Sequence, residues 1–231
     1  MRDFSWCLVL GLAGCGTVKG APGADAGPDA AIDAAPDAAP PCGPTTLLAG
    51  GNDLAAQGWT VTMQAPATVT NGLDYVRLET SSAVGARVGG QLLLSRAGAV
   101  TAGAPFKLQV VMMVESVTPH NAFDSAAAIL GAFTAPFGTG VQREQMIYLD
   151  GRAVGWADDT QSYAVTVLDG AYHTYELSVD ASNVARLTID GAQALMRTGF
   201  VSNGTIALGD QTNDLNVDSA LRIRSVTKLC L

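Results

Sequence analysis

The chain has 231 residues, of which 48% are hydrophobic and 15% are charged, and its formal net charge is −8 at pH 7. Nucleic acids and anionic lipid surfaces are bound through clustered Lys and Arg, and this acidic sequence contains no basic patch. The composition therefore excludes nucleic acid as a partner. Residues 42–231 are long enough to bury a single hydrophobic core.

The first feature in chain order is an apolar run, residues 4–10, followed by Leu-Ala-Gly-Cys at residues 12–15. This tetrapeptide resembles the lipobox of bacterial lipoproteins. The resemblance implies that residues 1–14 are a signal peptide and that the thiol of Cys15 is diacylated, which anchors the mature chain to a membrane. The apolar run is too short to span a bilayer, which takes about 20 residues. An ordinary signal peptide with a chance cysteine is the alternative, and the true start codon can also lie upstream.

Residues 15–41 form a lipidated cysteine followed by a stretch rich in Ala, Pro, Gly and Asp, without an aromatic residue. Such a segment cannot bury enough apolar surface to offset the entropy of ordering it. Its prolines interrupt the helix that alanine favours, and aspartates at every fourth position repel one another in it. We therefore predict a disordered linker. Gly16 is not the aspartate that retains some lipoproteins at the inner membrane, which favours the outer membrane or the cell surface.

Residues 42–231 carry the period-two alternation of half-buried strands and no convincing helical period. Tyr175, Leu177 and Val179 alternate with polar residues, and residues 106–114 are apolar at every even position. Asp-Gly and Asn-Gly pairs separate the alternating runs and accept the positive φ angles of tight hairpins. The pattern predicts an all-β, antiparallel sandwich or barrel. The Ala-rich residues 125–133 fit either a strand or a short helix.

Two cysteines, Cys42 and Cys230, lie at the two ends of residues 42–231. Exported proteins meet an oxidising environment, in which two leftover cysteines usually pair. We predict a Cys42–Cys230 disulfide, which requires the two ends of the domain to meet. Two free thiols or intermolecular bridges are the alternatives.

Several stretches carry a family resemblance. Residues 169–177 place a turn before an aromatic-His-x-aromatic strand, and residues 184–191 form a strand that ends in Asp-Gly. Residues 205–210 resemble a later Gly-x-Ile-x-Ile-Gly-Asp strand, and Trp59 resembles part of a first core strand. Together they resemble the concanavalin A-like lectin/glucanase superfamily, including its laminin G-like domains. The resemblance implies a jelly-roll β-sandwich of two curved antiparallel sheets, and by itself it implies no activity.

No catalytic residue can be assigned from the sequence. Glucanases of that superfamily use two glutamates in a Glu-x-Asp-x-x-Glu strand. That motif is absent around the glutamates of this region, which are Glu79, Glu115, Glu144 and Glu176. The Gly-x-Ser-x-Gly motif of serine hydrolases is absent as well. We interpret His173 as a core-facing residue and His120 as a surface residue, and keep a glycoside hydrolase or lyase with an unrecognised site as an alternative.

A cluster of aromatic and acidic residues points to carbohydrate binding, because rings stack on sugar faces and carboxylates bind hydroxyl groups. Trp156 lies next to two aspartates and between two tyrosine-bearing segments. The predicted sugar-binding residues are Trp156, Tyr148, Tyr163, Asp158 and Asp159. A buried core position is the alternative for Trp156, since it shares its phase with Val154.

The only cofactor that the sequence suggests is Ca²⁺, which prefers carboxylate and carbonyl oxygens on loops. One Asp-rich stretch near the end of the chain offers such oxygens, at Asp210, Asn213, Asp214 and Asp218. Solvated turns are the alternative interpretation of these residues.

The sequence therefore predicts a membrane-anchored, exported lipoprotein that displays a non-catalytic carbohydrate-binding sandwich. A structural or protein-interaction module of the cell envelope is the main alternative. The expected partners are the membrane, through the lipid on Cys15, and a polysaccharide or an envelope protein. We expect a monomer.

Overall fold

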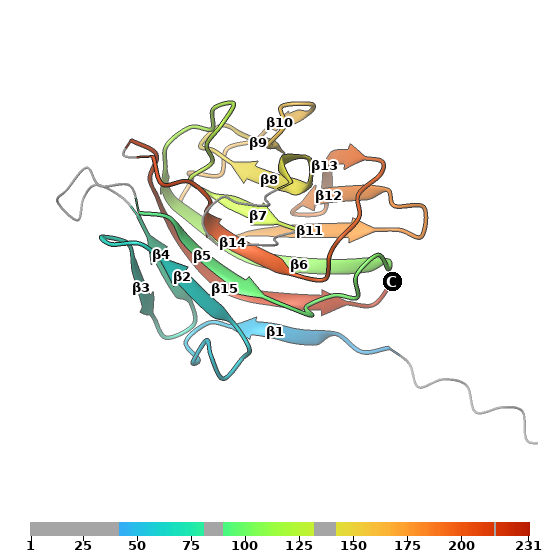
Figure 1. Cartoon of the computed structure of the whole chain (residues 1–231), viewed down its shortest axis with the longest axis horizontal. Helices are drawn as coiled ribbons and strands as arrows, with labels where there is room; N and C mark the ends of the chain where they lie inside the picture. Colours follow the sequence, from blue (N-terminus) through green and yellow to red (C-terminus); the bar gives the residue numbers. More distant parts are fainter. Residues whose placement is uncertain (1–41, 81–89, 132–141, 215) are drawn as a thin grey trace, which may run out of the picture. The chain divides into compact units, whose positions relative to one another are not determined.

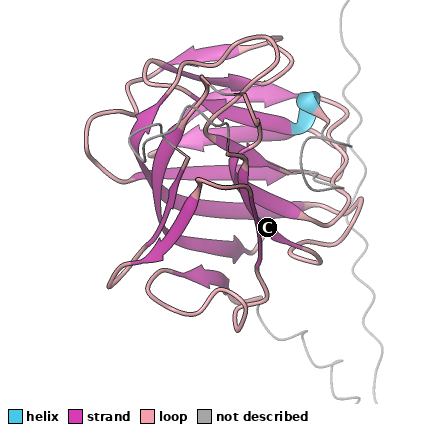
Figure 2. Cartoon of the chain, turned by 60° about the vertical axis from the view of Figure 1, so that its left-hand side comes forward, coloured by secondary structure: helices cyan, strands magenta, loops and turns pink. Residues whose placement is uncertain are grey.

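The computed structural model describes residues 42–80, 90–131, 142–214 and 216–231. These residues form two antiparallel sheets that pack as a jelly-roll β-sandwich (Figure 1). Within them, the one helical element is the short 3₁₀ turn η2 (Arg143–Gln145), and all other regular structure is strand (Figure 2). The predicted all-β fold is confirmed.

The first sheet, sheet A, contains the two longest strands, β6 (Phe106–Val117) and β15 (Ser219–Leu229), side by side at its centre. Its strand order is β13-β12-β11-β6-β15-β4-β3, and β1 pairs with β15 as well. Its other strands are β1 (Thr45–Ala49), β3 (Thr68–Asn71), β4 (Val76–Glu79), β11 (His173–Val179), β12 (Ala185–Ile189) and β13 (Ala192–Arg197).

The second sheet, sheet B, has the strand order β10-β9-β8-β7-β14-β5-β2. Its strands are shorter, and they are β2 (Thr60–Met63), β5 (Leu92–Arg96), β7 (Ala128–Leu130), β8 (Met146–Leu149), β9 (Ala153–Trp156), β10 (Ser162–Ala164) and β14 (Ile206–Asp210). In its described part, residues 125–131, the Ala-rich stretch that fitted strand or helix contains the strand β7 and no helix.

The inner face of sheet A follows the alternation of its sequence. Tyr175, Leu177 and Val179 of β11 are buried, and β11 pairs with β6 in a register that places Leu177 opposite Leu108. The intervening residues of β11 point outward and are polar, and Glu176 forms an ion pair with Lys107 of β6 at 2.7 Å. Sheet A is therefore apolar on one face and polar on the other, as expected of an antiparallel sheet with one solvated face.

Sheet B differs because both of its faces are apolar. Successive residues of β5 point to opposite faces, yet Leu92, Leu93 and Leu94 all have 0% of their surface exposed. Leu92 and Leu94 belong to the core between the sheets, whereas Leu93 belongs to a second cluster on the outer face of sheet B. The members of that second cluster are Leu93, Ala128, Leu130, Met146, Tyr148, Ala157 and Ala207.

A disulfide joins the two ends of the described fold. Cys42 precedes β1 and Cys230 follows β15, and these two strands are neighbours in sheet A. Their Cα atoms are 5.8 Å apart, which is within the range that a disulfide requires. The predicted pairing of Cys42 with Cys230 is present in the structure.

The predictions for the first part of the chain lie outside the described residues. They concern the signal peptide at residues 1–14, the lipid on Cys15 and the linker at residues 15–41. Among the residues that the structure describes, no helix has the length and apolar character needed to cross a membrane.

Candidate functional site

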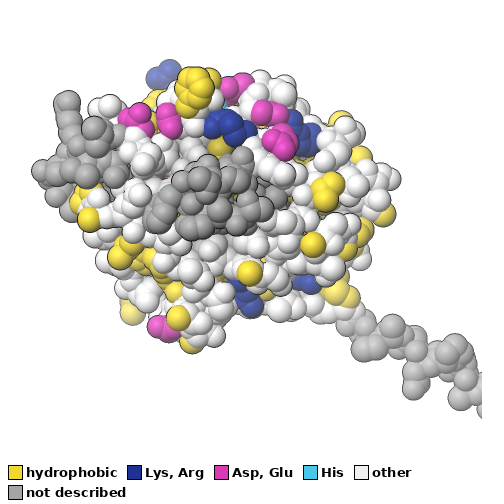
Figure 3. Space-filling model, viewed as in Figure 1, with side chains coloured by type: hydrophobic (Ala, Val, Ile, Leu, Met, Phe, Trp, Pro, Cys, Tyr) yellow, Lys and Arg dark blue, Asp and Glu magenta, His cyan; other side chains and the backbone are white. Residues whose placement is uncertain are grey.

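Three loops meet beside β8 and β9 and form what we call the loop site. They are residues 120–125, 157–160 and 211–214. Hydrogen bonds connect them, from His120 to Asp159 at 2.9 Å and from the Thr212 hydroxyl to Asp124 at 2.6 Å. Figure 3 shows charged side chains of both signs around a protruding hydrophobic side chain at the top of the view, where β10 and the β6–β7 connection lie in Figure 1.

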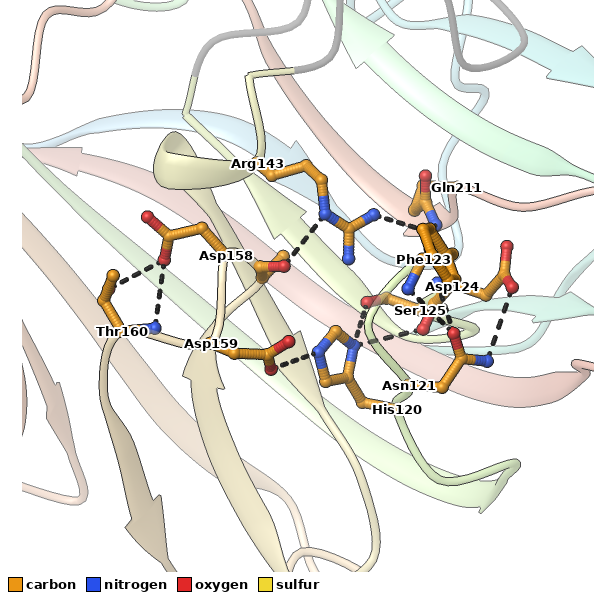
Figure 4. Close-up of polar contacts among 11 residues, drawn as sticks. His120, Asn121, Phe123, Asp124, Ser125, Arg143, Asp158, Asp159, Thr160 and Gln211 are labelled. Carbon is orange, nitrogen blue, oxygen red and sulfur yellow. Dashed lines mark hydrogen bonds and ion pairs between the residues drawn. The ribbon is translucent and has the colours of Figure 1, made fainter.

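The imidazole of His120 lies at the centre of the loop site. It stacks on the ring of Tyr148 in β8, with centroids 3.8 Å apart and planes 7° from parallel. Its Nδ1 bonds with the Ser125 hydroxyl at 2.7 Å, and its Nε2 bonds with the Asp159 carboxylate at 2.9 Å (Figure 4). Only 5% of the His120 side chain is exposed. His120 therefore joins two loops and covers one face of Tyr148.

Arg197, which lies on β13 of sheet A, binds the loop 157–160. Its Nη2 donates to the Asp158 carboxylate at 2.7 Å and to the Thr160 hydroxyl at 2.9 Å. Burial raises the pKa of Asp158, but the hydrogen bonds from Arg197 and Thr160 outweigh burial and hold this pKa below its ordinary value. Asp158 is therefore ionised at neutral pH and acts as the counter-charge of Arg197.

Phe123 is the exposed aromatic residue of the loop site, with 80% of its surface accessible to solvent. Its backbone is fixed although its ring is not covered. The N–H donates to Asn121 Oδ1 at 2.8 Å, and the carbonyl accepts hydrogen bonds from Arg143 Nη1 and from Gln211 Nε2 (Figure 4). A ring displayed on a fixed backbone is a suitable surface for an apolar ligand face.

Phe123 was not among the residues predicted from the sequence. It lies within the turn closed by Asn121 and Asp124 and belongs to no alternating run, so the period-two pattern indicates no role for it. The sequence signal that could have indicated this loop lies in Asn121 and Asp124, because such residues bond to nearby backbone and fix turns.

The three aromatic residues that the sequence proposed for sugar stacking are not exposed. Trp156 has 0% and Tyr148 has 6% of its surface exposed, and Tyr163 is half-buried against the core. Trp156 stays in phase with Val154 because β9 keeps a regular register with β8, and it packs with its ring centroid 6.0 Å from that of Phe200. This placement corrects the expected aromatic platform, since the rings of Trp156 and Tyr148 are covered and Tyr163 is only partly exposed. Two other members of the predicted set, Asp158 and Asp159, do lie in the loop site.

The four residues proposed as calcium ligands are Asp210, Asn213, Asp214 and Asp218, and the carboxylates of Asp210 and Asp214 accept hydrogen bonds from protein groups. Asp210 has 1% of its surface exposed and accepts hydrogen bonds from the Thr80 hydroxyl at 2.6 Å and the Thr212 N–H at 3.0 Å. Burial raises its pKa well above the ordinary value. Asp214 accepts a hydrogen bond from the Asn216 N–H at 2.8 Å; Asn213 is exposed and Asp218 is half-buried. Across the described ranges, no three His, Cys, Asp or Glu side chains come together as a metal site.

Ser125, His120 and Asp159 form a hydrogen-bonded chain that resembles a catalytic triad in its residue types. The arrangement is unsuited to nucleophilic attack, because the Ser125 residue has only 1% of its surface exposed. The carboxylate at the other end, Asp159, is the accessible member, with 51% of its side chain exposed. A triad needs the opposite order, with the nucleophile open to the substrate and the carboxylate buried behind the imidazole.

Two glutamates approach each other on the outer face of sheet A, but arginines hold both. Arg77 donates to Glu79, and to Glu115 at 2.7 Å, and Arg222 forms an ion pair with Glu115. Glycoside cleavage requires one carboxyl group that is protonated and able to act as an acid. Both carboxylates are instead engaged by guanidinium groups, and this arrangement differs from an acid that faces a substrate in a cleft.

No protein-family model matches the chain, and a search of curated proteins also finds no match. Solved structures do match. The carbohydrate esterase vb_24B_21 from Shiga toxin-encoding bacteriophage phi24B superposes with a TM-score of 0.53 at 17% identity, covering 82% of this chain and 100% of that chain. A point mutant of the Emp46p carbohydrate recognition domain superposes with a TM-score of 0.50 at 9% identity, covering 77% of this chain and 91% of that chain. At such identities the likeness shows the fold alone.

Proposed function

We propose that this chain is an exported, membrane-anchored lipoprotein whose sandwich binds a carbohydrate at the loop site without cleaving it. The observation that carries the proposal is the exposed ring of Phe123. The backbone of this residue is fixed by hydrogen bonds with polar side chains. Sugar rings have apolar C–H faces that stack on aromatic rings, and hydroxyl groups around their edges that bind carboxylates and amides.

The polar groups beside Phe123 suit such a ligand. Asp159 has half of its side chain exposed, while its partner His120 fixes one carboxylate oxygen. Asn121 and Asp124 are bonded to each other at 3.3 Å and lie on either side of Phe123 in sequence. Groups held in place by neighbouring bonds bind with less loss of conformational entropy, which favours affinity. The loop site therefore offers one stacking surface and several ordered oxygen and nitrogen atoms.

The fold supports the same proposal in a general way. Two proteins that share it are a carbohydrate esterase and a carbohydrate recognition domain. Because the buried Ser125 and the arginine-paired glutamates do not suit hydrolysis, we propose binding in preference to an esterase, glycoside hydrolase or lyase.

A protein-interaction role is the second candidate, and a different surface favours it. Leu73 is 100% exposed at the β3–β4 hairpin of sheet A. Two arginines of the same sheet stack on tyrosine rings. The guanidinium carbon of Arg222 lies 4.6 Å from the ring centroid of Tyr75, and that of Arg224 lies 3.9 Å from the ring centroid of Tyr172. Tyrosine and arginine are enriched at the energetic centres of protein interfaces.

Affinity electrophoresis through gels that contain soluble polysaccharides tests the function. Replacing Phe123 by Ala should weaken retention by about tenfold, which is the size expected for losing one stacking contact. Phe123→Trp should keep the wild-type retention, because it preserves an aromatic ring at this position. Leu73→Ala is the matched control, because it also removes an exposed apolar side chain but on the opposite sheet. Equal retention of the Phe123→Ala and wild-type proteins on a glycan that binds would contradict the site.

The export and anchoring part of the proposal is supported by the lipobox-like residues 12–15 and by the disulfide, which forms in oxidising compartments. Cys15→Ser should yield unprocessed or released protein that no longer partitions into detergent. Metabolic labelling with a fatty acid that still marked the Cys15→Ser protein would show that the lipid is attached elsewhere.

A further inference from the structure

We propose that Arg143 is a fixed cation that joins the loops 120–125 and 157–160, so that the loop site assembles and binds carbohydrate without Ca²⁺. This inference deepens the proposed carbohydrate-binding function, and it concerns what holds the site in shape. Arg143 is a positioning residue in this account, because it acts through the loops that carry Phe123 and Asp159.

Arg143 reaches both loops from η2. Its Nε donates to the carbonyl of Ala157 at 3.0 Å, and its Nη1 donates to the carbonyl of Phe123 (Figure 4). Both of these contacts are with backbone oxygens, which are the atoms that a loop-bound Ca²⁺ also uses as ligands. The guanidinium therefore places a positive charge between backbone oxygens of the two loops.

The carboxylates of the loop site already have protein partners. Arg197 balances Asp158, and His120 bonds with Asp159. Asp124 accepts a hydrogen bond from the Thr212 hydroxyl at 2.6 Å. A calcium ion takes about six to eight oxygen ligands, and it would have to displace these donors to obtain them. The oxygens of the loop site thus do not form a ready calcium site.

A guanidinium suits the bridging role better than an ammonium group would. It is planar, stays charged throughout the pH range of proteins, and directs several donors at fixed angles. In Arg143 two of its nitrogens point to two separate loops, whereas its buried Nη2 has no hydrogen-bond partner among the described residues. A lysine at the same position can approach one carbonyl at a time, so Arg143→Lys should rescue the bridge only in part.

Amide hydrogen exchange of the sugar-free protein tests the bridge directly. In Arg143→Met, the amides of residues 120–125 and 157–160 should exchange about tenfold faster or more, because two hydrogen bonds from a charged group are lost. The exchange rates of these amides in Arg143→Lys should lie between those of wild type and Arg143→Met. Arg152→Met, which replaces an exposed arginine on the β8–β9 hairpin, is the control and should leave both loops unchanged. Wild-type exchange should be the same in EDTA and in CaCl₂, and loops that gain protection on adding CaCl₂ would overturn the proposal.

Affinity electrophoresis then separates this inference from the function on which it rests. On a glycan that the wild type binds, retention should be equal in EDTA and in CaCl₂, and Arg143→Met should lose about tenfold under both conditions. Retention that appears only with CaCl₂ would overturn the inference while supporting the function. If no glycan is retained, but amide exchange in the two loops is faster in Arg143→Met and unchanged in Arg152→Met, the bridge is supported and the carbohydrate-binding function is contradicted. Loops that exchange alike in Arg143→Met and wild type would overturn the bridge.

Discussion

The outer faces of the two sheets differ in the residues they carry. The outward residues of sheet A include paired charges, such as Lys107 with Glu176 and Arg77 with Glu115. On sheet B the outward residues are apolar and buried, as Leu93 and Met146 show with 0% exposure each. A face that is apolar and covered contributes to the core, and a face of paired charges is solvated. Among the described residues, the site that we propose for carbohydrate lies in the loops between strands and not on the outer face of either sheet.

The largest expected effect concerns the Cys42–Cys230 disulfide, which joins the ends of two neighbouring strands of sheet A. Replacing Cys42 and Cys230 by Ser should lower the free energy of unfolding by about 5 kcal/mol in the chain-entropy model, because the two residues are 188 positions apart. Denaturant unfolding measures the loss. Two alkylated thiols in the intact mass of non-reduced, exported protein would show that the link does not form.

The next effect tests whether the outer face of sheet B behaves as core. Leu93→Ala should cost about 2–5 kcal/mol, and Leu94→Ala, whose side chain points to the inner face of the same strand, should cost about the same. Urea unfolding of the two variants gives the comparison. A Leu93→Ala variant within 0.5 kcal/mol of wild type, about the size of a surface substitution, would show that this face is open.

A smaller effect comes from a charged cluster at the end of β11 in sheet A. His173 bonds with Asp190 at 2.7 Å and with Asp169 at 3.1 Å. Burial lowers the pKa of His173, but the bonds to the two carboxylates outweigh burial and raise it above the ordinary 6.5. Its stabilising contribution is therefore complete below about pH 6.5 and is lost as the pH rises through the folded pKa.

His173→Gln should remove that pH dependence. The difference in melting temperature between wild type and His173→Gln should be larger at pH 5 than at pH 9, with a free-energy difference of about 1 kcal/mol at most because both carboxylates are substantially exposed. The carboxylates act in the other direction, since their pKa values are lowered and their contribution is lost in acid. A gap that widens from pH 5 to pH 9 would contradict the assigned protonation.

The smallest effect is expected for the partly exposed ion pairs of sheet A. A double-mutant cycle with Lys107→Ala and Glu176→Ala should give a coupling energy of about 0.2–1 kcal/mol, and salt should reduce it. Coupling of several kcal/mol that persists at high salt would mean that this face is buried, and the contrast between the two outer faces would fail.

The same contrast explains how far the sequence predicts the fold. Sheet A was predictable, because strands such as β6 and β11 alternate between core and solvent and the Asp190-Gly191 turn has the positive φ angles of 51° and 84° that a tight hairpin needs. Sheet B was harder to predict, because Met146–Leu149 is buried at every position and shows no alternation. An apolar run of this length fits strand or helix equally well. The Ala-rich stretch around β7 was ambiguous for the same reason.

The candidate site was predicted only in part. Asp158 and Asp159 were proposed because they lie next to Trp156 and a turn, and the structure places both in the loop site. Phe123 was missed, since the hydrogen bonds that fix its backbone carbonyl come from Arg143 and Gln211, which are distant in sequence. Trp156 was proposed as a ligand-stacking ring because aromatic residues are few in this domain and it lies beside polar residues. Its burial follows from the pairing of β9 with β8, which local sequence does not specify.

Hydrogen exchange with a retained oligosaccharide tests the central claim most directly, since it compares the loops with both outer faces in one experiment. The account predicts that added oligosaccharide slows exchange in residues 120–125 and 157–160 and leaves β6 and β15 of sheet A unchanged. Protection confined to the strands and hairpins of sheet A, with the loop site unaffected, would contradict it.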